Sequence, residues 1–239
     1  MTKRIAILQS NYIPWKGYFD MINSVDEFIL YDTVQFTKND WRNRNKIKTS
    51  QGPAWLTIPV RHNFGQLIQD VQFSDSRWAQ NHWRTIAQQY SKAAHFAQYK
   101  PIFEQLYASA AQEQYLSVLN HRFIVEICGI LGITTRITWS KDYEMVDGQT
   151  ERLLHLCHQT GAGEYISGPA AKDYMQEELF RDAGIKLTYM DYSGYPEYKQ
   201  LHPPFEHAVS ILDLIFNAGQ DAPKYMKSFR CSTSAKTTE

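Results

Sequence analysis

The sequence contains few cysteines, carries no net charge and lacks long apolar runs, and each of these features excludes a class of protein. Its 239 residues include three cysteines, which are too few and too scattered for a disulfide framework. Lysine plus arginine balance aspartate plus glutamate at 25 each, so no overall field draws the chain to nucleic acid or to a membrane surface. Any anion binding must therefore be local.

The chain also lacks the apolar segments that direct proteins to membranes. No window holds the roughly eighteen uncharged apolar residues that a membrane-spanning helix needs. The first residues, MTKRIAILQ, run directly into a strand-like stretch without the apolar core of a signal peptide. We therefore expect a cytoplasmic protein in which Cys128 and Cys157 are buried thiols and Cys231 is exposed near the end.

Motifs for the common cofactors and metals are missing as well. Without GxGxxG after a strand and without a P-loop, neither NAD nor a Walker-type NTPase is indicated, and the cofactor stays unknown. His155 and His158 lie at i, i+3 on one predicted helix, but no third ligand is near them, so no metal site is predicted. The DxD motif, with which glycosyltransferases hold a metal-bound sugar diphosphate, and the GxSxG motif of a nucleophilic serine are also missing. Nucleic-acid binding is not expected, because no recognisable RNA module accompanies the tyrosines and tryptophans.

Short apolar runs of strand length alternate with amphipathic stretches of helical length. This order predicts an α/β fold, with a mainly parallel sheet flanked by helices, in a single domain at residues 1–220. Three helical segments at about 78–131 predict a helical insert, and residues 221–239 predict a polar C-terminal tail. The predicted strands are residues 4–9, 27–32, 55–60, 136–140, 165–168 and 185–191, and the predicted helices of the core are residues 15–24, 150–160 and 171–183.

The stretch DTVQFTKNDWRNRNKIK, residues 32–48, places four cations in seven positions. If residues 42–48 are extended, the period of two puts these cations on one face, about 7 Å apart. They are Arg42, Arg44, Lys46 and Lys48. Such a stripe suits the phosphates of a diphosphate substrate, but it is also typical of a solvated edge strand whose charges prevent edge-to-edge pairing. Asn43 and Asn45 on the other face, where an edge strand is usually apolar, favour binding.

Two turns between a predicted strand and helix lie where α/β sheets bind ligands. In QSNYIPWKGYFDMI, Pro14 is close to the first helical position and Gly17 leaves room for close approach. In EYISGPAAKDYM, Ser167 and Gly168 form a second such turn, and Lys172 could reach a phosphate held there. Each turn also has a structural alternative. The aromatic residues of the first turn would belong to the core, and the second would be a plain turn with a solvated lysine.

Three side chains are candidate general bases. In HAVSILDLIFNAG, Asp213 lies in line with Ser210 and Asn217 on an otherwise apolar helix. Asp213 is therefore either a tuned base or a structural partner, and we expect it to be buried and bonded to an arginine, a lysine or a backbone amide. His202 precedes two prolines that stiffen its loop, and Asp32 ends a predicted strand.

These motifs together resemble a known family. ILQSNYIPWKGYFDMI, DEFILYDTVQFTKNDWRNRNKIK and WLTIPV resemble the N-terminal signature of the WbqC-like family, and YISGPAAKDYM, FRDAGIKL and YPEYKQLHPPFEHAVSILDLIFNAG resemble its later blocks. The likeness covers most of the chain outside the helical insert. Family members are similar to proteins of bacterial O-antigen and other surface-polysaccharide gene clusters, some of them associated with amino sugars that carry an acyl or aminoacyl group.

The residues and the resemblance lead to one expectation. We expect an enzyme of surface-polysaccharide biosynthesis that acylates or aminoacylates a nucleotide-linked or phosphorylated amino sugar, with Asp32, His202 or Asp213 as the base. A non-catalytic protein that binds a polyanionic ligand or a partner in the same pathway is the alternative. We expect Arg42, Arg44 and Asp32 to converge with the turns at Trp15 and Ser167 on one cleft at one edge of the sheet. The side chains expected to bind substrate are Gln9, Tyr12, Trp15, Gln35, Arg42, Arg44, Asn45, Lys46, Ser167, Gly168 and Lys172.

Overall fold

The computed structural model describes residues 2–229 and contains one large parallel sheet and two small antiparallel ones. The large sheet has the strand order β7-β2-β1-β8-β9, and every pair of neighbouring strands is parallel. Its strands are β1 (Arg4–Leu8), β2 (Glu27–Leu30), β7 (Arg136–Trp139), β8 (Glu164–Ser167) and β9 (Lys186–Tyr189). This confirms the predicted α/β class and the mainly parallel sheet.

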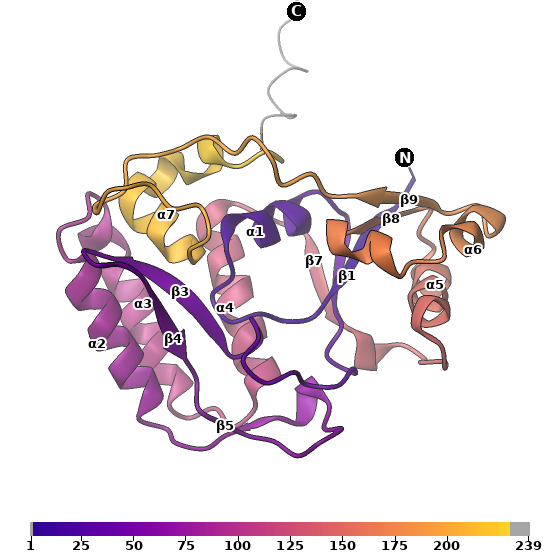
Figure 1. Ribbon diagram of the computed structural model, residues 1–239, viewed down its shortest axis with the longest axis horizontal. Helices are drawn as coiled ribbons and strands as arrows, with labels where there is room; N and C mark the ends of the chain where they lie inside the picture. The colour runs from indigo at the N-terminus through magenta and orange to yellow at the C-terminus, as the bar shows by residue number, and fades with distance from the viewer. Residues whose placement is uncertain (1, 230–239) are drawn as a thin grey trace, which may run out of the picture.

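Helices cover both faces of the large sheet, because both faces of its central strands are apolar. On β1, Ala6 belongs to one apolar core, whereas Ile5 and Ile7 belong to a second core on the opposite face. Helices α1 and α4 contribute apolar side chains to the first core, and α5 and α6 contribute them to the second (Figure 1). These helices are α1 (Lys16–Asn23), α4 (Leu116–Leu131), α5 (Gln149–Thr160) and α6 (Glu177–Asp182).

The order of the strands places a switch point at β1. The chain passes outward from β1 to β2 and β7, and it then returns to β8 and β9 on the other side of β1. Connections that diverge in this way leave a crevice at the carboxyl ends of two neighbouring strands, where open α/β sheets commonly bind ligands. Here the two strands are β1, which is followed by residues 9–15, and β8, which is followed by Gly168.

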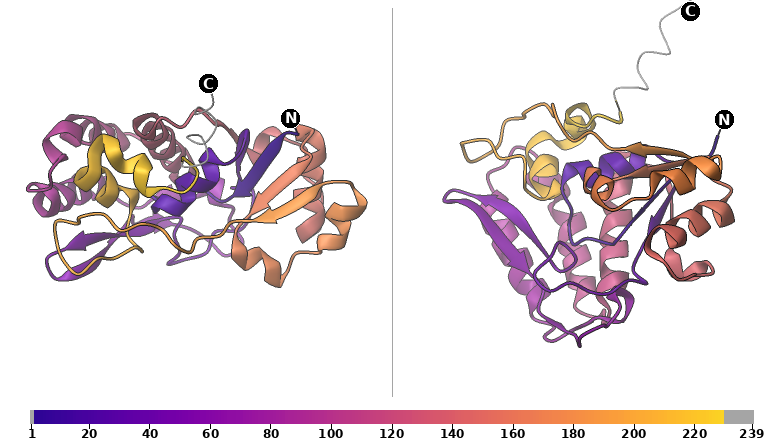
Figure 2. Two further views of the ribbon diagram at one scale, coloured as in Figure 1. Left: turned by 90° about the horizontal axis from the view of Figure 1, so that it is seen from above. Right: turned by 45° about the vertical axis from the view of Figure 1, so that its right-hand side comes forward.

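Three helices, α2 (Trp78–Tyr90), α3 (Phe96–Ala110) and α4, form the predicted helical insert. A further helix, α7 (Ile211–Ala218), packs on them, because the ring of Phe216 lies 5.2 Å from that of Tyr90 and 5.3 Å from that of Phe103. In Figures 1 and 2 these helices occupy one end of the molecule, and the large sheet with α5 and α6 occupies the other. Among residues 2–229, no helix has the length and apolar character needed to cross a membrane.

The cationic stretch forms the first strand of a hairpin beside the helical insert. Strands β3 (Arg44–Thr49) and β4 (Gly52–Thr57) are antiparallel and form a sheet of their own. The strand predicted at residues 55–60 therefore lies outside the parallel sheet, because Gly52, with φ of 101°, lets the chain turn back at once. The second small sheet pairs β5 (Val60–Arg61) with β6 (Gln72–Phe73), and the 3-10 helix η1 (Ile68–Asp70) lies between them.

Two predicted boundaries differ from the structure. The helix predicted at residues 171–183 is divided into the 3-10 helix η3 (Pro169–Asp173) and α6, because the backbone at Gln176 leaves the helical region, with ψ of 87°. Part of the predicted polar tail is ordered, since η4 (Gly219–Tyr225) is helical and Met226 is buried. The rest of that tail, residues 230–239, lies outside the described residues.

The thiols of Cys128 on α4 and Cys157 on α5 are buried and free, as expected. Burial raises the pKa of each thiol to about 12. Both thiols therefore stay protonated at neutral pH, and neither is an activated nucleophile. Cys231, which was expected to be exposed, lies outside the described residues.

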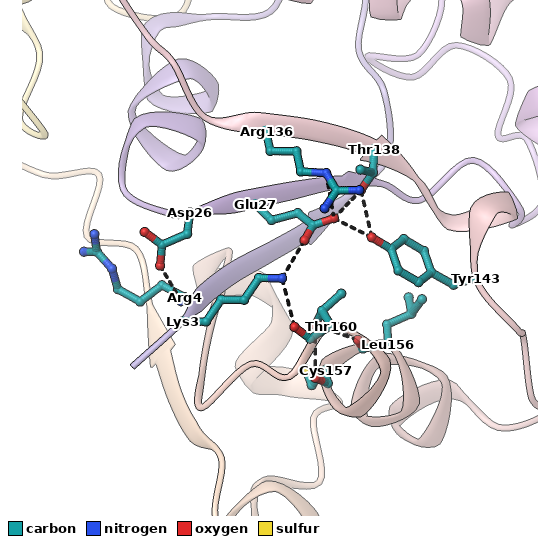
Figure 3. A network of polar contacts seen from close by, with 10 residues as sticks. All are labelled: Lys3, Arg4, Asp26, Glu27, Arg136, Thr138, Tyr143, Leu156, Cys157 and Thr160. Atoms are coloured by element: carbon teal, nitrogen blue, oxygen red, sulfur yellow. Dashed lines mark hydrogen bonds and ion pairs between the residues drawn. The ribbon is translucent and has the colours of Figure 1, made fainter. Parts of the chain in front are cut away.

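A buried carboxylate ties the amino-terminal edge of the large sheet together. The side chain of Glu27 on β2 is 1% exposed, and Oε2 lies 2.8 Å from the Lys3 ammonium. Its Oε1 accepts hydrogen bonds from Thr138, at 2.9 Å, and from Tyr143 (Figure 3). Lys3 also donates to the carbonyl oxygen of Thr160 at the end of α5. Glu27 thereby joins β2, β7 and α5.

This network predicts a pH-dependent contribution to stability. Burial raises the pKa of Glu27, but hydrogen bonds from Lys3, Tyr143 and Thr138 outweigh burial and hold the pKa below its ordinary value of 4.5. The stabilisation is therefore present above pH 4.5 and is lost as the pH falls through the folded-state pKa. We expect Glu27→Gln to lower the free energy of unfolding by about 1–3 kcal/mol at pH 7.

Urea denaturation at a series of pH values measures this effect. The difference between wild type and Glu27→Gln should shrink as the pH falls below 4.5. Glu178→Gln is the matched control, because Glu178 is exposed, and it should behave as wild type at every pH. A difference that stayed constant with pH would contradict the account of Glu27.

Candidate functional site

Two small cavities meet at Trp41, beside the hairpin. The first has a volume of about 250 Å³ and the second of about 220 Å³, and both are lined by Trp41. We call the two cavities together the Trp41 cleft. The other residues that line the first cavity are Asn11, Pro14, Trp15, Asn45 and Ala208, and those that line the second are Asn39, Asp40, Arg44, Lys46 and Trp55.

The cleft combines exposed aromatic rings with positive charge. Trp41 and Trp55 are 41% and 43% exposed, and their ring centroids are 5.4 Å apart. The Arg44 guanidinium lies 4.2 Å from the centroid of Trp55, and the Lys46 ammonium lies 5.0 Å from it. The ring thus holds both cations by cation–π contact. Among the described residues, the buried Nε of Arg44 has no hydrogen-bond partner.

The outer edge of β3 is covered, which argues against edge protection as the purpose of these cations. The amide of Ser210 donates to the carbonyl oxygen of Lys46 at 2.8 Å, and the amide of Lys48 donates to the hydroxyl of Tyr90 at 2.9 Å. A further strand therefore finds these backbone groups already paired. Lys48 itself is 2% exposed and donates to the carbonyl oxygen of Pro204, so it adds no charge to the cleft.

The segment before β3 fixes the position of Trp41. The Trp41 amide donates to Oδ1 of Asp40 at 2.7 Å, and its carbonyl oxygen accepts from the amide of Tyr12 at 3.0 Å. The Arg42 guanidinium lies in this turn and not on the face of β3. It donates to Oδ1 of Asn11 at 2.8 Å and pairs with Asp40 at 3.3 Å. Trp41 is thus anchored on both sides, although its ring is exposed.

The connection between β1 and α1 is held in a strained conformation. Ile13 is fully buried and has φ of 36°, in the left-handed region that β-branched residues rarely adopt. Asn45 holds it there, because Nδ2 donates to the carbonyl oxygens of Tyr12 and Ile13 at 3.1 and 3.0 Å. Pro14 accepts from the amide of Ile211 at 2.9 Å. Strained backbone that the surroundings enforce is common at functional sites.

Trp15 forms one wall of the cleft, and Gly17 gives it room. The Trp15 ring packs against Tyr192 and Tyr195, with centroids 5.1 and 5.7 Å away. A Cβ atom at Gly17 would lie 2.3 Å from the Trp15 ring. The sequence suggested that Gly17 permits close approach, and in the structure the approaching group is the Trp15 ring.

Gly17→Ala should therefore displace Trp15 from the wall of the cleft. Alanine normally stabilises a helix by about 0.5–1 kcal/mol relative to glycine, but here the contact with Trp15 should cancel that gain. Gly129→Ala in α4 is the control, because nothing lies within 4 Å of its added Cβ, and it should raise the free energy of unfolding. Thermal unfolding and the near-ultraviolet tryptophan spectrum measure both effects. An unaltered spectrum for Gly17→Ala would contradict the account.

Comparison with known families matches residues 9–225 to the WbqC-like protein family. The chain belongs to this family. The Uncharacterized protein Rv1507c of Mycobacterium tuberculosis (strain ATCC 25618 / H37Rv) is 52% identical over 230 residues, which cover 95% of this chain and 99% of the relative. No solved structure matches the chain.

In this WbqC-like chain, Asp32 is a buried residue that joins two segments by hydrogen bonds. It is 1% exposed, accepts from the amide of Ser10 at 2.8 Å, and accepts from the hydroxyl of Ser117 on α4. Burial raises the pKa of Asp32, and the hydrogen bonds from Ser117 and Ser10 oppose that rise. The carboxylate therefore joins the end of β1 to α4 and does not line the Trp41 cleft.

Asp213 on α7 is buried as expected, but its partners differ from the expected ones. It accepts from the hydroxyls of Tyr198 and Tyr90 at 2.7 and 2.9 Å and from Nε2 of Gln200 at 2.9 Å. The expected arginine, lysine or backbone amide is replaced by these neutral donors. Burial raises the pKa of Asp213. These hydrogen bonds lower it, but the effect of burial is larger. His202 lies 3.4 Å from the carbonyl oxygen of Gln89, and neither His202 nor Asp213 lines the cleft.

The other predicted binding residues divide between the cleft and other places. Trp15, Arg44, Asn45 and Lys46 surround it, whereas Tyr12 is buried and its hydroxyl lies 2.6 Å from that of Tyr107. The backbone carbonyl of Gln9 accepts from the hydroxyl of Tyr18 at 3.0 Å near the end of β1, and Gln35 lines a separate open groove beside Arg152.

The second predicted turn also lies away from the Trp41 cleft. Ser167 and Gly168 lie at the carboxyl end of β8, and the Lys172 ammonium lies 5.0 Å from the ring of Tyr189 on β9. The hairpin that carries Arg44 belongs to a different sheet (Figure 1). None of Ser167, Gly168 and Lys172 lines the Trp41 cleft, so the convergence of this turn with the cations stays a prediction.

Sequence reasoning missed Trp41, Trp55 and Asp40 as cleft residues. Trp41 stands inside the cationic stretch, which was a usable signal, and Trp55 lies directly opposite Lys46 in the hairpin register. Within residues 2–229, no group of three or more histidine, cysteine or acidic side chains is arranged to hold a metal ion.

Proposed function

We propose that the Trp41 cleft binds a nucleotide-linked or phosphorylated amino sugar, to whose amine the protein transfers an acyl or aminoacyl group in surface-polysaccharide biosynthesis. The observation that carries this proposal is the juxtaposition of two exposed tryptophans with two cations. Trp41 and Trp55 offer apolar faces on which a sugar or base stacks, and Arg44 and Lys46 offer donors to phosphate oxygens. The resemblance of the family to proteins of O-antigen gene clusters supports the substrate class.

The transfer requires a group that accepts the proton of the attacking amine. As the amine nitrogen bonds to the acyl carbon, the bond from that carbon to its leaving group breaks and the nitrogen loses a proton. Asp40 is a carboxylate that lines the same cavity as Arg44, and its side chain is 28% exposed. We assign the proton to Asp40, because neither Asp32, Asp213 nor His202 lines the cleft.

Turnover separates this proposal from a non-catalytic binding protein. The protein is incubated with a nucleoside-diphosphate amino sugar and, in turn, with acyl thioesters, acyl phosphates and aminoacyl adenylates. Mass spectrometry should find the sugar heavier by one acyl group with one donor class. Asp40→Asn should bind the sugar as wild type does and form product more slowly, whereas Asp147→Asn, an exposed control, should match wild type. Tight binding without product for every donor would favour the binding protein.

A further inference from the structure

A third, larger groove adjoins the Trp41 cleft. It has a volume of about 640 Å³, and Asn39 lines both the groove and the second cavity of the cleft. We call it the Asn43 groove. On the hairpin, Thr57 of the groove lies directly opposite Arg44 of the cleft, so these two residues lie side by side on one face of the hairpin. A molecule in the groove can thus meet a sugar in the cleft.

The walls of the groove carry cations without acidic partners. Lys38 and Arg61 are exposed, and within the described part of the chain neither forms an ion pair. Arg61 makes one long hydrogen bond, 3.5 Å, to the carbonyl oxygen of Ser74. His62 lies on the same wall, and Asp70 is a carboxylate among the lining residues. The groove therefore favours an anion, and its cations are available to one.

Asn43, one of the residues that line the groove, has an amide oxygen that lacks a donor. Asn43 is 5% exposed, and its Nδ2 donates to the carbonyl oxygen of Ile58 at 2.9 Å. Its Oδ1 is buried and, among the described residues, has no hydrogen-bond partner. A buried acceptor without a donor is costly, so a ligand N–H group that supplied the donor would gain affinity. At the rim, between lining residues Asn63 and Gln66, Phe64 is 99% exposed.

We propose that the Asn43 groove binds the phosphopantetheine of an acyl thioester, which is the acyl donor for the amino sugar in the Trp41 cleft. This inference rests on the proposed function. Phosphopantetheine carries a phosphate for Lys38 and Arg61, amide N–H groups for Asn43 and an apolar dimethyl segment. In the transfer, the amine nitrogen bonds to the thioester carbon and the carbon–sulfur bond breaks. The proton from the amine ends on the released sulfur, so atoms and electrons balance.

Isothermal titration with defined probes tests the groove. Coenzyme A and 4′-phosphopantetheine should bind, and adenosine 3′,5′-bisphosphate, which has phosphates but no pantetheine, should bind at least about tenfold more weakly. The double variant Lys38→Ala with Arg61→Ala should weaken coenzyme A by roughly tenfold or more, whereas Arg181→Ala, an exposed control on α6, should have no effect. Equal affinity for the bisphosphate would overturn the role of Asn43.

Further measurements distinguish a carrier-protein donor from coenzyme A. They also distinguish failure of the groove assignment from failure of the proposed function. If the donor is protein-borne, a holo-acyl carrier protein should bind more tightly than coenzyme A, and Phe64→Ala should weaken only the carrier protein. Arg44→Ala should leave the affinity for coenzyme A unchanged. If both pantetheine probes fail to bind while a nucleoside-diphosphate amino sugar binds, the groove assignment fails and the proposed function stands. If the sugar also fails to bind, both fail.

Discussion

Replacing Arg44 by alanine should weaken the binding of a nucleoside-diphosphate amino sugar by at least about tenfold. The guanidinium lies over Trp55 in the cleft, and a hydrogen bond to a charged group contributes about 1.5–3 kcal/mol. The free energy of unfolding should change by less than about 1 kcal/mol, because the loss is one cation–π contact on a half-buried side chain. Isothermal titration and urea denaturation of one purified variant measure both quantities.

The shape of the Arg44 effect distinguishes a phosphate contact from general attraction. Arg44→Lys should recover only part of the affinity, because lysine keeps the charge and loses the two-pronged geometry, and the remaining affinity should fall as salt is added. Arg77→Ala is the matched control, since Arg77 is exposed and pairs with Asp75 at 2.8 Å, and it should bind the sugar as wild type does. Unchanged affinity for Arg44→Ala together with new self-association in light scattering would instead support edge protection.

Replacing Asp213 by alanine should lower the free energy of unfolding by about 3 kcal/mol or more. The change leaves the hydroxyls of Tyr198 and Tyr90 and the amide of Gln200 without their acceptor in a buried site. Tyr90 also accepts from the amide of Lys48, so the loss should loosen β3. Asp213→Asn should cost less, because it keeps an oxygen acceptor for one or two of the donors.

Urea denaturation with a surface control tests the role of Asp213. Asp182→Ala is the control, because Asp182 is exposed and lies 3.8 Å from Arg181, and it should change the free energy of unfolding by less than about 0.5 kcal/mol. If Asp213→Ala were as stable as wild type but formed no product, Asp213 would be a catalytic base, and its assignment as a structural acceptor would be wrong.

The sequence predicts the parts of this fold that depend on local pattern. Short apolar runs mark β1 and β2, since strands buried on both faces need such runs. The alternation in the cationic stretch likewise places Arg44 and Lys46 on one face of β3, as the register with β4 shows. In both cases the period of the side chains along a strand is sufficient.

The roles of individual polar residues depend on partners far away in the sequence. Asp32 is bonded by Ser117, which is 85 positions away, and Tyr12 by Tyr107, which is 95 positions away. No local pattern reveals that these side chains are enclosed, so both resemble site residues in the sequence. Trp55 joins the cleft through its register with Lys46, which is known only once the hairpin is known.

A crystal structure of the protein with a bound nucleoside-diphosphate amino sugar would show whether the Trp41 cleft is the sugar site. We expect the sugar or base to stack on Trp41 or Trp55, with phosphate oxygens within hydrogen-bond distance of Arg44 or Lys46. The amine should face Asp40 and the Asn43 groove. A ligand bound instead at the carboxyl ends of β1 and β8, beside Gly168, would contradict the account, because the site would then lie at the switch point of the large sheet.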